Sequence, residues 1–115
     1  MTKRVAVLLS GRGSNFQSLL NASLEGSLGG EISLVISNRL GAGGLSIAQN
    51  AGIETALIDH QRYPTREAFD QDLAGAIDSA QPDLVVLAGF MRILTPEFVA
   101  HFSERLMNIH PSLLP

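Results

Sequence analysis

The chain of 115 residues contains no cysteine and no tryptophan, and only 17% of its residues are charged. Without cysteine it can form neither a disulfide framework nor a thiolate metal site. No apolar run approaches the roughly 20 residues that cross a bilayer as a helix, so we expect no membrane partner. Eight Lys and Arg against eleven Asp and Glu give a net charge of -3, which argues against a broad nucleic-acid-binding surface.

Apolar residues nonetheless make up 45% of the chain, which is enough for a packed core and excludes a disordered protein. The basic start and short apolar run of residues 1–11 are not followed by a cleavage site, so we expect no signal peptide and a cytoplasmic protein. Residues 108–115 are apolar and proline-bearing, unlike the polar ends of most domains. We therefore expect residues 1–115 to form a single domain that is incomplete at its C-terminal side.

Short apolar runs alternate along the chain with segments of helical spacing. The runs lack polar alternation, as in parallel strands that are buried on both faces. This order of strands and helices predicts an α/β domain with a parallel sheet. The expected strands are 5–9, 32–36, 54–58, 84–88 and 106–109, the expected helices are 15–25, 45–51, 66–79 and 96–102, and residues 40–44 are expected to form a glycine-rich loop.

Two of the expected helices have a clear apolar face. In the first helix the residues expected to be buried are Phe16, Leu19, Leu20 and Leu24. In the helix over 66–79 the buried face is expected to hold Phe69, Leu73, Ala76 and Ile77. The acidic residues of that helix are expected to form its solvated face, namely Glu67, Asp70, Asp72 and Asp78.

Ligands of open parallel sheets bind at the carboxyl ends of the strands, so the loops that leave those ends are the candidate sites. The first such loop is Ser10-Gly11-Arg12-Gly13-Ser14-Asn15. Its two glycines allow a tight turn, and the free N–H groups of the following helix favour an anion such as phosphate. The loop matches neither of the glycine patterns for dinucleotides or nucleoside triphosphates. A plain turn between strand and helix is the alternative explanation.

A second loop, Gly89-Phe90-Met91-Arg92-Ile93-Leu94, follows the most apolar strand. An apolar loop at a ligand crevice can line a pocket for a flat hydrophobic molecule. Composition alone favours the simpler interpretation, a turn that buries its own side chains.

A third candidate site is Asn108 with His110, at the end of the last expected strand. Residues at i and i+2 of a strand point to the same face. An amide beside an imidazole can stabilise an oxyanion and supply a proton. Because each residue could equally be held by an ordinary hydrogen bond at a strand end, it is the position beside the other two loops that favours a catalytic role.

The remaining polar residues give weaker signals. No histidines and carboxylates have the spacing of metal ligands, so we expect no metal site. We expect His60 and His101 to be surface residues. The context of Ser10, Ser14 and Ser112 does not match that of a serine nucleophile.

Taken together, residues 10–15, 87–94 and 108–115 resemble the formyltransferase superfamily. Within it they are most similar to the phosphoribosylglycinamide formyltransferases, the folate-dependent transformylases of purine biosynthesis, and the similarity runs in register over the whole chain. The resemblance implies a Rossmann-like parallel sheet with helices on both faces, of which this chain holds the N-terminal part. It also implies transfer of a formyl group from 10-formyltetrahydrofolate to the amine of glycinamide ribonucleotide, without a metal.

The resemblance further implies roles for individual residues. Asn108 would polarise the formyl oxygen, and His110 would be the catalytic imidazole. Arg66 would meet the folate tail. The residues that would hold the substrate phosphate are Gly11, Arg12, Gly13, Ser14 and Asn15. The folate pocket would be lined by Phe90, Met91, Arg92, Ile93 and Leu94, with Asn108 beside them.

Members of this family continue well beyond the segment that ends at Pro115. Their continuation carries an aspartate that pairs with the catalytic histidine, so we expect the 115-residue chain alone to be weakly active or inactive. The alternatives are a formyltetrahydrofolate hydrolase, in which water replaces the amine, and a non-catalytic phosphate-binding fragment. The expected partners are the two small-molecule substrates, and the expected assembly is a monomer or a homodimer.

Overall fold

The computed structural model describes residues 3–11, 14–26, 30–39, 41–90 and 94–109 of the chain. In these residues five parallel strands form one sheet in the order β3-β2-β1-β4-β5. The strands are β1 (Lys3–Leu9), β2 (Gly30–Ser37), β3 (Glu54–Leu57), β4 (Leu84–Ala88) and β5 (Leu106–Ile109). The helices are α1 (Ser14–Leu24), α2 (Gly43–Asn50), α3 (Arg66–Ala80) and α4 (Pro96–His101), with a short 3-10 helix, η1, at His60–Arg62.

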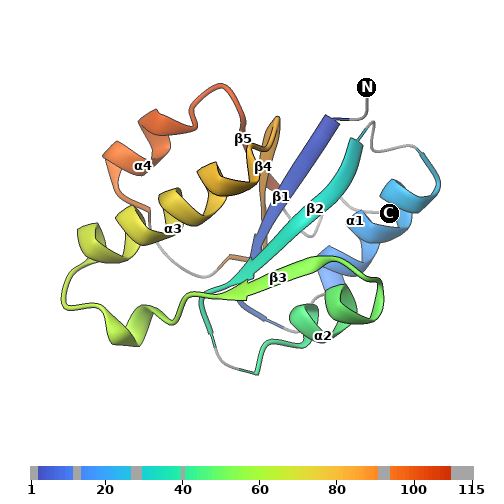
Figure 1. Cartoon of the computed structure of the whole chain (residues 1–115), viewed down its shortest axis with the longest axis horizontal. Helices are drawn as coiled ribbons and strands as arrows, with labels where there is room; N and C mark the ends of the chain where they lie inside the picture. Colours follow the sequence, from blue (N-terminus) through green and yellow to red (C-terminus); the bar gives the residue numbers. More distant parts are fainter. Residues whose placement is uncertain (1–2, 12–13, 27–29, 40, 91–93, 110–115) are drawn as a thin grey trace.

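Helices cover both faces of the sheet. Figure 1 shows α1 and α2 on one side of the strands and α3 and α4 on the other. Each side has its own apolar core: Phe16 of α1 and Ala48 of α2 belong to one, and Phe69 of α3 and Phe98 of α4 to the other. This three-layer arrangement confirms the predicted α/β fold with a Rossmann-like parallel sheet.

The central strand β1 supplies buried residues to both cores. Its alternate side chains face opposite sides, as the two-residue period of a strand requires. The side chains on the α1 and α2 side are Val5, Val7 and Leu9, and those on the α3 and α4 side are Ala6 and Leu8. Burial on both faces explains why this strand is an unbroken apolar run in the sequence.

The path of the chain places a topological switch point between β1 and β4. The chain moves outward from β1 to β2 and β3, then crosses to β4 on the other side of β1 and continues to β5. Leu87 of β4 pairs in register with Leu8 of β1 on one side and with Asn108 of β5 on the other. The loops after β1 and β4 therefore leave neighbouring strands at the same edge, where open α/β sheets bind ligands.

Local signals fix the ends of the two helices on the α3 side. Thr65 caps α3, its side chain accepting a hydrogen bond from the N–H of Ala68 at 3.1 Å. Thr95 caps α4 in the same way, accepting from the N–H of Phe98 at 3.2 Å. Gln81 ends α3 in the left-handed conformation, with φ of 50°. These caps agree with the helix boundaries expected from the sequence.

The predicted glycine-rich loop over residues 40–44 is wrong at its end, because α2 already begins at Gly43. Gly44 faces the last residue of β1, and a Cβ atom at this position would lie 2.5 Å from Leu9 Cδ2. This glycine therefore lets the helix pack closely against the strand instead of forming a loop. The helix η1 was also not expected; Asp59 caps it by accepting from the N–H of Gln61 at 3.0 Å.

Two of the predicted helix faces also need correction. Leu24, expected in the core, is 77% exposed because it is the last residue of α1 and nothing in the described structure covers it. Asp70, expected on the solvated face of α3, is only 4% exposed. Its burial reflects a contact with α4 that the spacing within α3 does not reveal. Glu67, Asp72 and Asp78 are exposed as expected.

Candidate functional site

The turn between β1 and α1 lies at the carboxyl edge of the sheet, as predicted. Ser10 leaves β1 buried, Gly11 is exposed, and α1 begins at Ser14. The N-terminal end of α1 therefore lies at this edge, where its free N–H groups and dipole favour an anion. Arg12, Gly13 and the side chains of Ser14 and Asn15 lie outside the described residues, so their roles in phosphate binding stay predictions.

A buried hydrogen bond that the sequence analysis missed joins this turn to the neighbouring strand. The hydroxyl of Ser10 donates to Oδ1 of Asn38 at 2.5 Å. The two residues are 3% and 1% exposed, respectively. The available signal was that each is a polar residue following an apolar strand. Because β1 and β2 are parallel neighbours, their ends meet at the same edge.

His60 extends this contact toward α3. Its Nδ1 lies 2.9 Å from the main-chain oxygen of Asn38, and its own N–H donates to the same oxygen at 3.4 Å. A carbonyl oxygen can only accept, so Nδ1 carries the proton. The imidazole is half-buried and stands edge-on to the ring of Phe69, with the centroids 6.5 Å apart. The prediction of an ordinary surface residue was therefore wrong for His60.

Asn108 lies at the same edge, two strands away from β1. It belongs to β5, pairs in register with Leu87 of β4, and its side chain is exposed. It is thus available to a ligand instead of being buried in the core. His110 lies outside the described residues, so its position beside Asn108 and its catalytic role stay predictions.

The segment after β4 begins and ends against the core. Gly89 has a positive φ of 71°, which turns the chain away from the strand. Phe90 and Leu94 are half-buried and pack against the core on the α3 and α4 side. Arg66 is the first residue of α3 and is exposed. Met91, Arg92 and Ile93 lie outside the described residues, and a folate-binding role for the segment stays a prediction.

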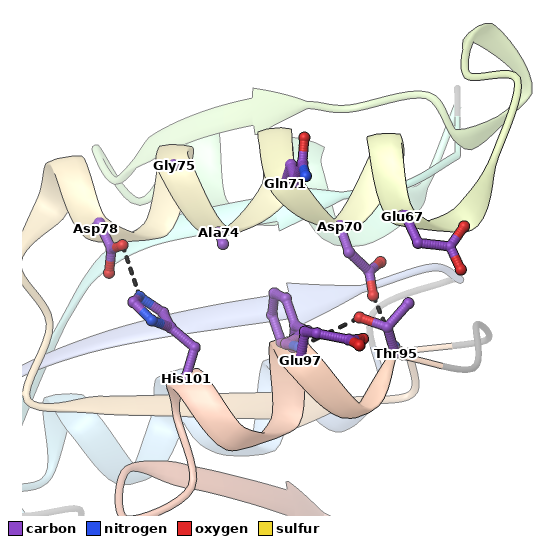
Figure 2. A pocket seen from close by; sticks show the side chains of 10 residues that line it. Glu67, Asp70, Gln71, Ala74, Gly75, Asp78, Thr95, Glu97 and His101 are labelled. Carbon is purple, nitrogen blue, oxygen red and sulfur yellow. Dashed lines mark hydrogen bonds and ion pairs between the residues drawn. The ribbon is translucent and has the colours of Figure 1, made fainter.

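A cleft of about 570 Å³ lies between α3 and α4, and its lining includes Glu67 and Thr95, the chain neighbours of Arg66 and Leu94. Figure 2 shows the carboxylates of Glu67, Asp70 and Asp78 on the α3 side, and Glu97 on α4. His101 is exposed, as predicted, and its Nε2 lies 2.8 Å from Oδ2 of Asp78. Asp70 instead bonds to the main chain at the start of α4, which ties the two helices together.

The described part of the chain contains no group of three or more His, Cys, Asp or Glu residues that could hold a metal ion. Within the same residues, every helix is too short or too polar to cross a membrane.

A parallel sheet with a switch point, and with a turn leading from its central strand into a helix, is the architecture of the α/β proteins that bind ligands at the carboxyl edge of the sheet. Comparison with known families gives the more particular assignment. The profile described as formyl transferase matches residues 3–115, and the chain belongs to this family.

The chain is similar to phosphoribosylglycinamide formyltransferases and to a trifunctional purine biosynthetic protein. Phosphoribosylglycinamide formyltransferase of Escherichia coli K12 is 49% identical over 111 residues, covering 96% of this chain and 52% of that protein. The trifunctional purine biosynthetic protein adenosine-3 of Drosophila melanogaster is 48% identical over 115 residues, covering 98% of this chain and 8% of that protein.

Solved structures show the same similarity. Phosphoribosylglycinamide formyltransferase of Coxiella burnetii superposes with a TM-score of 0.91 at 48% identity, covering 100% of this chain and 54% of that one. Glycinamide ribonucleotide transformylase 1 of Symbiobacterium toebii gives 0.90 at 43% identity, covering 99% of this chain and 54% of that one. The chain thus spans about half the length of the bacterial relatives that it matches.

Proposed function

We propose that this chain is part of an enzyme that transfers a formyl group from 10-formyltetrahydrofolate to the primary amine of glycinamide ribonucleotide. The observation that carries the proposal is the meeting of two features at one edge of the sheet. One is the turn from β1 into α1, and the other is the exposed Asn108 at the end of β5. The names of the relatives that are nearly half identical over almost the whole chain support the same reaction.

The phosphate of the ribonucleotide would bind at the turn from Gly11 to Asn15. Main-chain N–H groups at the start of α1 would donate to its oxygens, and the helix dipole would favour its charge. Arg12 would supply a positive charge beside it. A Cβ atom at Gly13 would obstruct close approach of the phosphate to the main chain, which explains the choice of glycine there.

The folate would lie along the segment that follows β4. Main-chain groups between Phe90 and Leu94 would meet its heterocycle, and the exposed Arg66 at the start of α3 would meet the carboxylates of its tail. Phe90 and Leu94, at the two ends of the segment, pack on the same apolar core as residues of α3, which would keep the segment near Arg66. The formyl group would thereby be presented to the amine near Asn108.

The chemistry would be an attack of the substrate amine on the formyl carbon, which forms a tetrahedral intermediate. The side-chain amide of Asn108 and a protonated His110 would donate to its oxyanion. One such donor contributes on the order of 2.7–4 kcal/mol to transition-state stabilisation. A proton would pass from the amine to the folate nitrogen, through His110 or a water, as the intermediate collapses. These steps require no metal and no covalent bond to the enzyme.

The finer properties of the protein are part of the same proposal. Residues 1–115 would form one domain, the N-terminal part of the formyltransferase fold. The protein would be cytoplasmic, a monomer or a homodimer, with no nucleic-acid or membrane partner. Because the relatives are about twice as long, groups that complete the folate pocket and raise the pKa of His110 would come from their second half, and the chain alone would be weakly active or inactive.

A formyl-transfer assay tests the proposal on the 115-residue chain and on a form extended to the length of the bacterial relatives. We expect transfer by the long form and little or none by the short form. In the long form, His110→Ala should lower turnover at least about 100-fold with nearly unchanged ribonucleotide affinity. Equal activity of the two forms would refute the proposed need for the second half, and unchanged turnover of His110→Ala would refute the role of the histidine.

Calorimetric titration separates the proposed reaction from its alternatives. Binding of both glycinamide ribonucleotide and a 10-formylfolate analogue to the long form is expected of the transferase. Binding of the folate analogue alone would indicate a hydrolase, and binding of the ribonucleotide alone would indicate a non-catalytic phosphate-binding protein.

A further inference from the structure

The phosphate-binding turn starts at a residue that is held by its side chain. Ser10 directly precedes Gly11, is 3% exposed, and its hydroxyl hydrogen-bonds Oδ1 of Asn38. Glycine provides no side-chain anchor, so the direction in which the turn leaves β1 depends on the contacts made by Ser10.

Asn38 is a rigid partner because its main chain is held on two sides. Its N–H donates to the oxygen of Leu9 at 3.4 Å, which continues the pairing of β2 with β1 beyond the end of the strand. Its carbonyl oxygen accepts from Nδ1 of His60 at 2.9 Å and from the His60 N–H at 3.4 Å. The side chain that receives the Ser10 hydroxyl is therefore attached to a fixed point between β1 and the segment after β3.

The side chain of Asn38 is neutral, which is compatible with a neighbouring anion site. It is 1% exposed and neutral, and an amide oxygen accepts a hydrogen bond without adding negative charge next to a phosphate. A carboxylate in the same place would accept the Ser10 hydroxyl but would repel the ligand and carry a cost of burial. The amide thus provides the anchor without weakening the attraction of the turn for phosphate.

From these contacts we infer that Asn38 is a positioning residue of the phosphate site, which acts through Ser10 to hold the turn in its binding conformation before the ligand arrives. The inference rests on the proposed function, because it assigns to the pair a role in binding the phosphate of glycinamide ribonucleotide. A fixed turn binds more tightly because less conformational entropy is lost when the ligand is bound.

The test compares Ser10→Thr with Ser10→Val in the 115-residue chain. Threonine and valine have nearly the same shape, and only threonine keeps the hydroxyl that bonds Asn38. Affinities for glycinamide ribonucleotide and for inorganic phosphate are measured by calorimetry at a temperature where circular dichroism shows both variants folded. We expect Ser10→Val to bind roughly three- to tenfold more weakly than Ser10→Thr, the range for loss of one hydrogen bond.

Two further variants separate positioning from stability. His60→Ala removes the contact on the opposite side of Asn38. It keeps the inference testable even if Ser10→Val does not fold. We expect this variant to bind phosphate about twofold or more weakly. Gln49→Ala is the control: it removes a bond of 3.2 Å from the Gln49 amide to Thr55, away from the site, and should leave the affinity unchanged.

The outcomes distinguish the inference from the function on which it rests. Equal affinities of the threonine and valine variants, or a loss in Gln49→Ala as large as in His60→Ala, would overturn the positioning role and leave the phosphate site in place. Absence of ribonucleotide and phosphate binding by the unaltered chain would overturn the phosphate site itself, and with it the inference.

Discussion

The carboxylate of Asp70 accepts a hydrogen bond from the main-chain N–H of Thr95, with Oδ2 and N 2.7 Å apart (Figure 2). Asp70 lies in α3 and Thr95 caps α4, so the bond joins two helices at the point where the segment after β4 ends. Both residues are buried, and Oδ1 of Asp70 has no hydrogen-bond partner among the residues that the structure describes. A half-satisfied buried carboxylate is unfavourable, which makes the remaining bond to Thr95 important.

The effect of replacing Asp70 on stability should therefore depend on whether the new side chain still accepts a hydrogen bond from the Thr95 N–H. Asp70→Ala leaves the Thr95 N–H buried without a partner and should lower the free energy of unfolding by about 1–3 kcal/mol. Asp70→Asn keeps an oxygen for that N–H and removes a buried charge, so its stability should stay within about 1 kcal/mol of the original. Urea unfolding monitored by circular dichroism measures both values.

The control for this pair is Asp78→Ala in the same helix. Asp78 bonds His101 at 2.8 Å, but the two side chains are 46% and 50% exposed. An exposed pair of this kind contributes less than about 1 kcal/mol. If Asp78→Ala lowered the free energy of unfolding as much as Asp70→Ala, burial of the bond between Asp70 and Thr95 would not increase its contribution to stability.

Two of the glycines within helices, Gly44 and Gly75, should respond to alanine in opposite directions. At Gly44 a Cβ atom would lie 2.5 Å from Cδ2 of the fully buried Leu9, so Gly44→Ala should destabilise the fold by about 1–3 kcal/mol. At Gly75 the added Cβ would have no described atom within 4 Å beyond its chain neighbours and the backbone of its own helix, so Gly75→Ala should stabilise α3 by about 0.5–1 kcal/mol. Thermal unfolding of the two variants checks the signs, and a stabilising Gly44→Ala would contradict the close packing of α2 on β1.

Stability should also depend on pH through Tyr63. Its phenol donates to Oδ2 of Asp72 at 2.7 Å, and this hydrogen bond raises the pKa of Tyr63 above its usual value of 10.0, as do burial and the charge of Asp72. The folded state holds the Tyr63 proton more tightly than the unfolded state does. The contribution of this hydrogen bond to the free energy of unfolding is therefore complete below about pH 10, and it is lost as the pH rises through the higher pKa of the folded protein.

Tyr63→Phe removes this contribution and provides the measurement. As the pH rises above about 10, the free energy of unfolding should fall more steeply for the original protein than for Tyr63→Phe. Parallel pH dependences of the two proteins would show that the bond to Asp72 does not persist in solution.

Much of the architecture could be predicted because its causes are local. The strands Leu84–Ala88 and Leu106–Ile109 have the predicted limits, and the first is an apolar run that is buried or half-buried along its whole length. The side chains of Thr65 and Thr95 accept from N–H groups three residues ahead, so both partners of each bond lie within one short segment of the sequence.

Features that depend on distant partners could not be predicted in this way. Asp70 has the spacing of an exposed residue, and its burial depends on Thr95, 25 residues further along the chain. The contact between Ser10 and Asn38 joins residues 28 apart, and it requires the register of β1 with β2. Spacing within one helix or strand contains no information on such pairs, so the hydrogen bond between Ser10 and Asn38 could be found only from the structure.

Titration of glycinamide ribonucleotide into the 115-residue chain, with Gly13→Val beside it, is the most direct test of the account. We expect saturable binding to the original chain and a loss of at least about tenfold in affinity for Gly13→Val, because the added side chain obstructs the approach of the phosphate to the main chain. Failure of the original chain to bind, or equal binding by Gly13→Val, would contradict the assignment of the turn between β1 and α1 as the phosphate site.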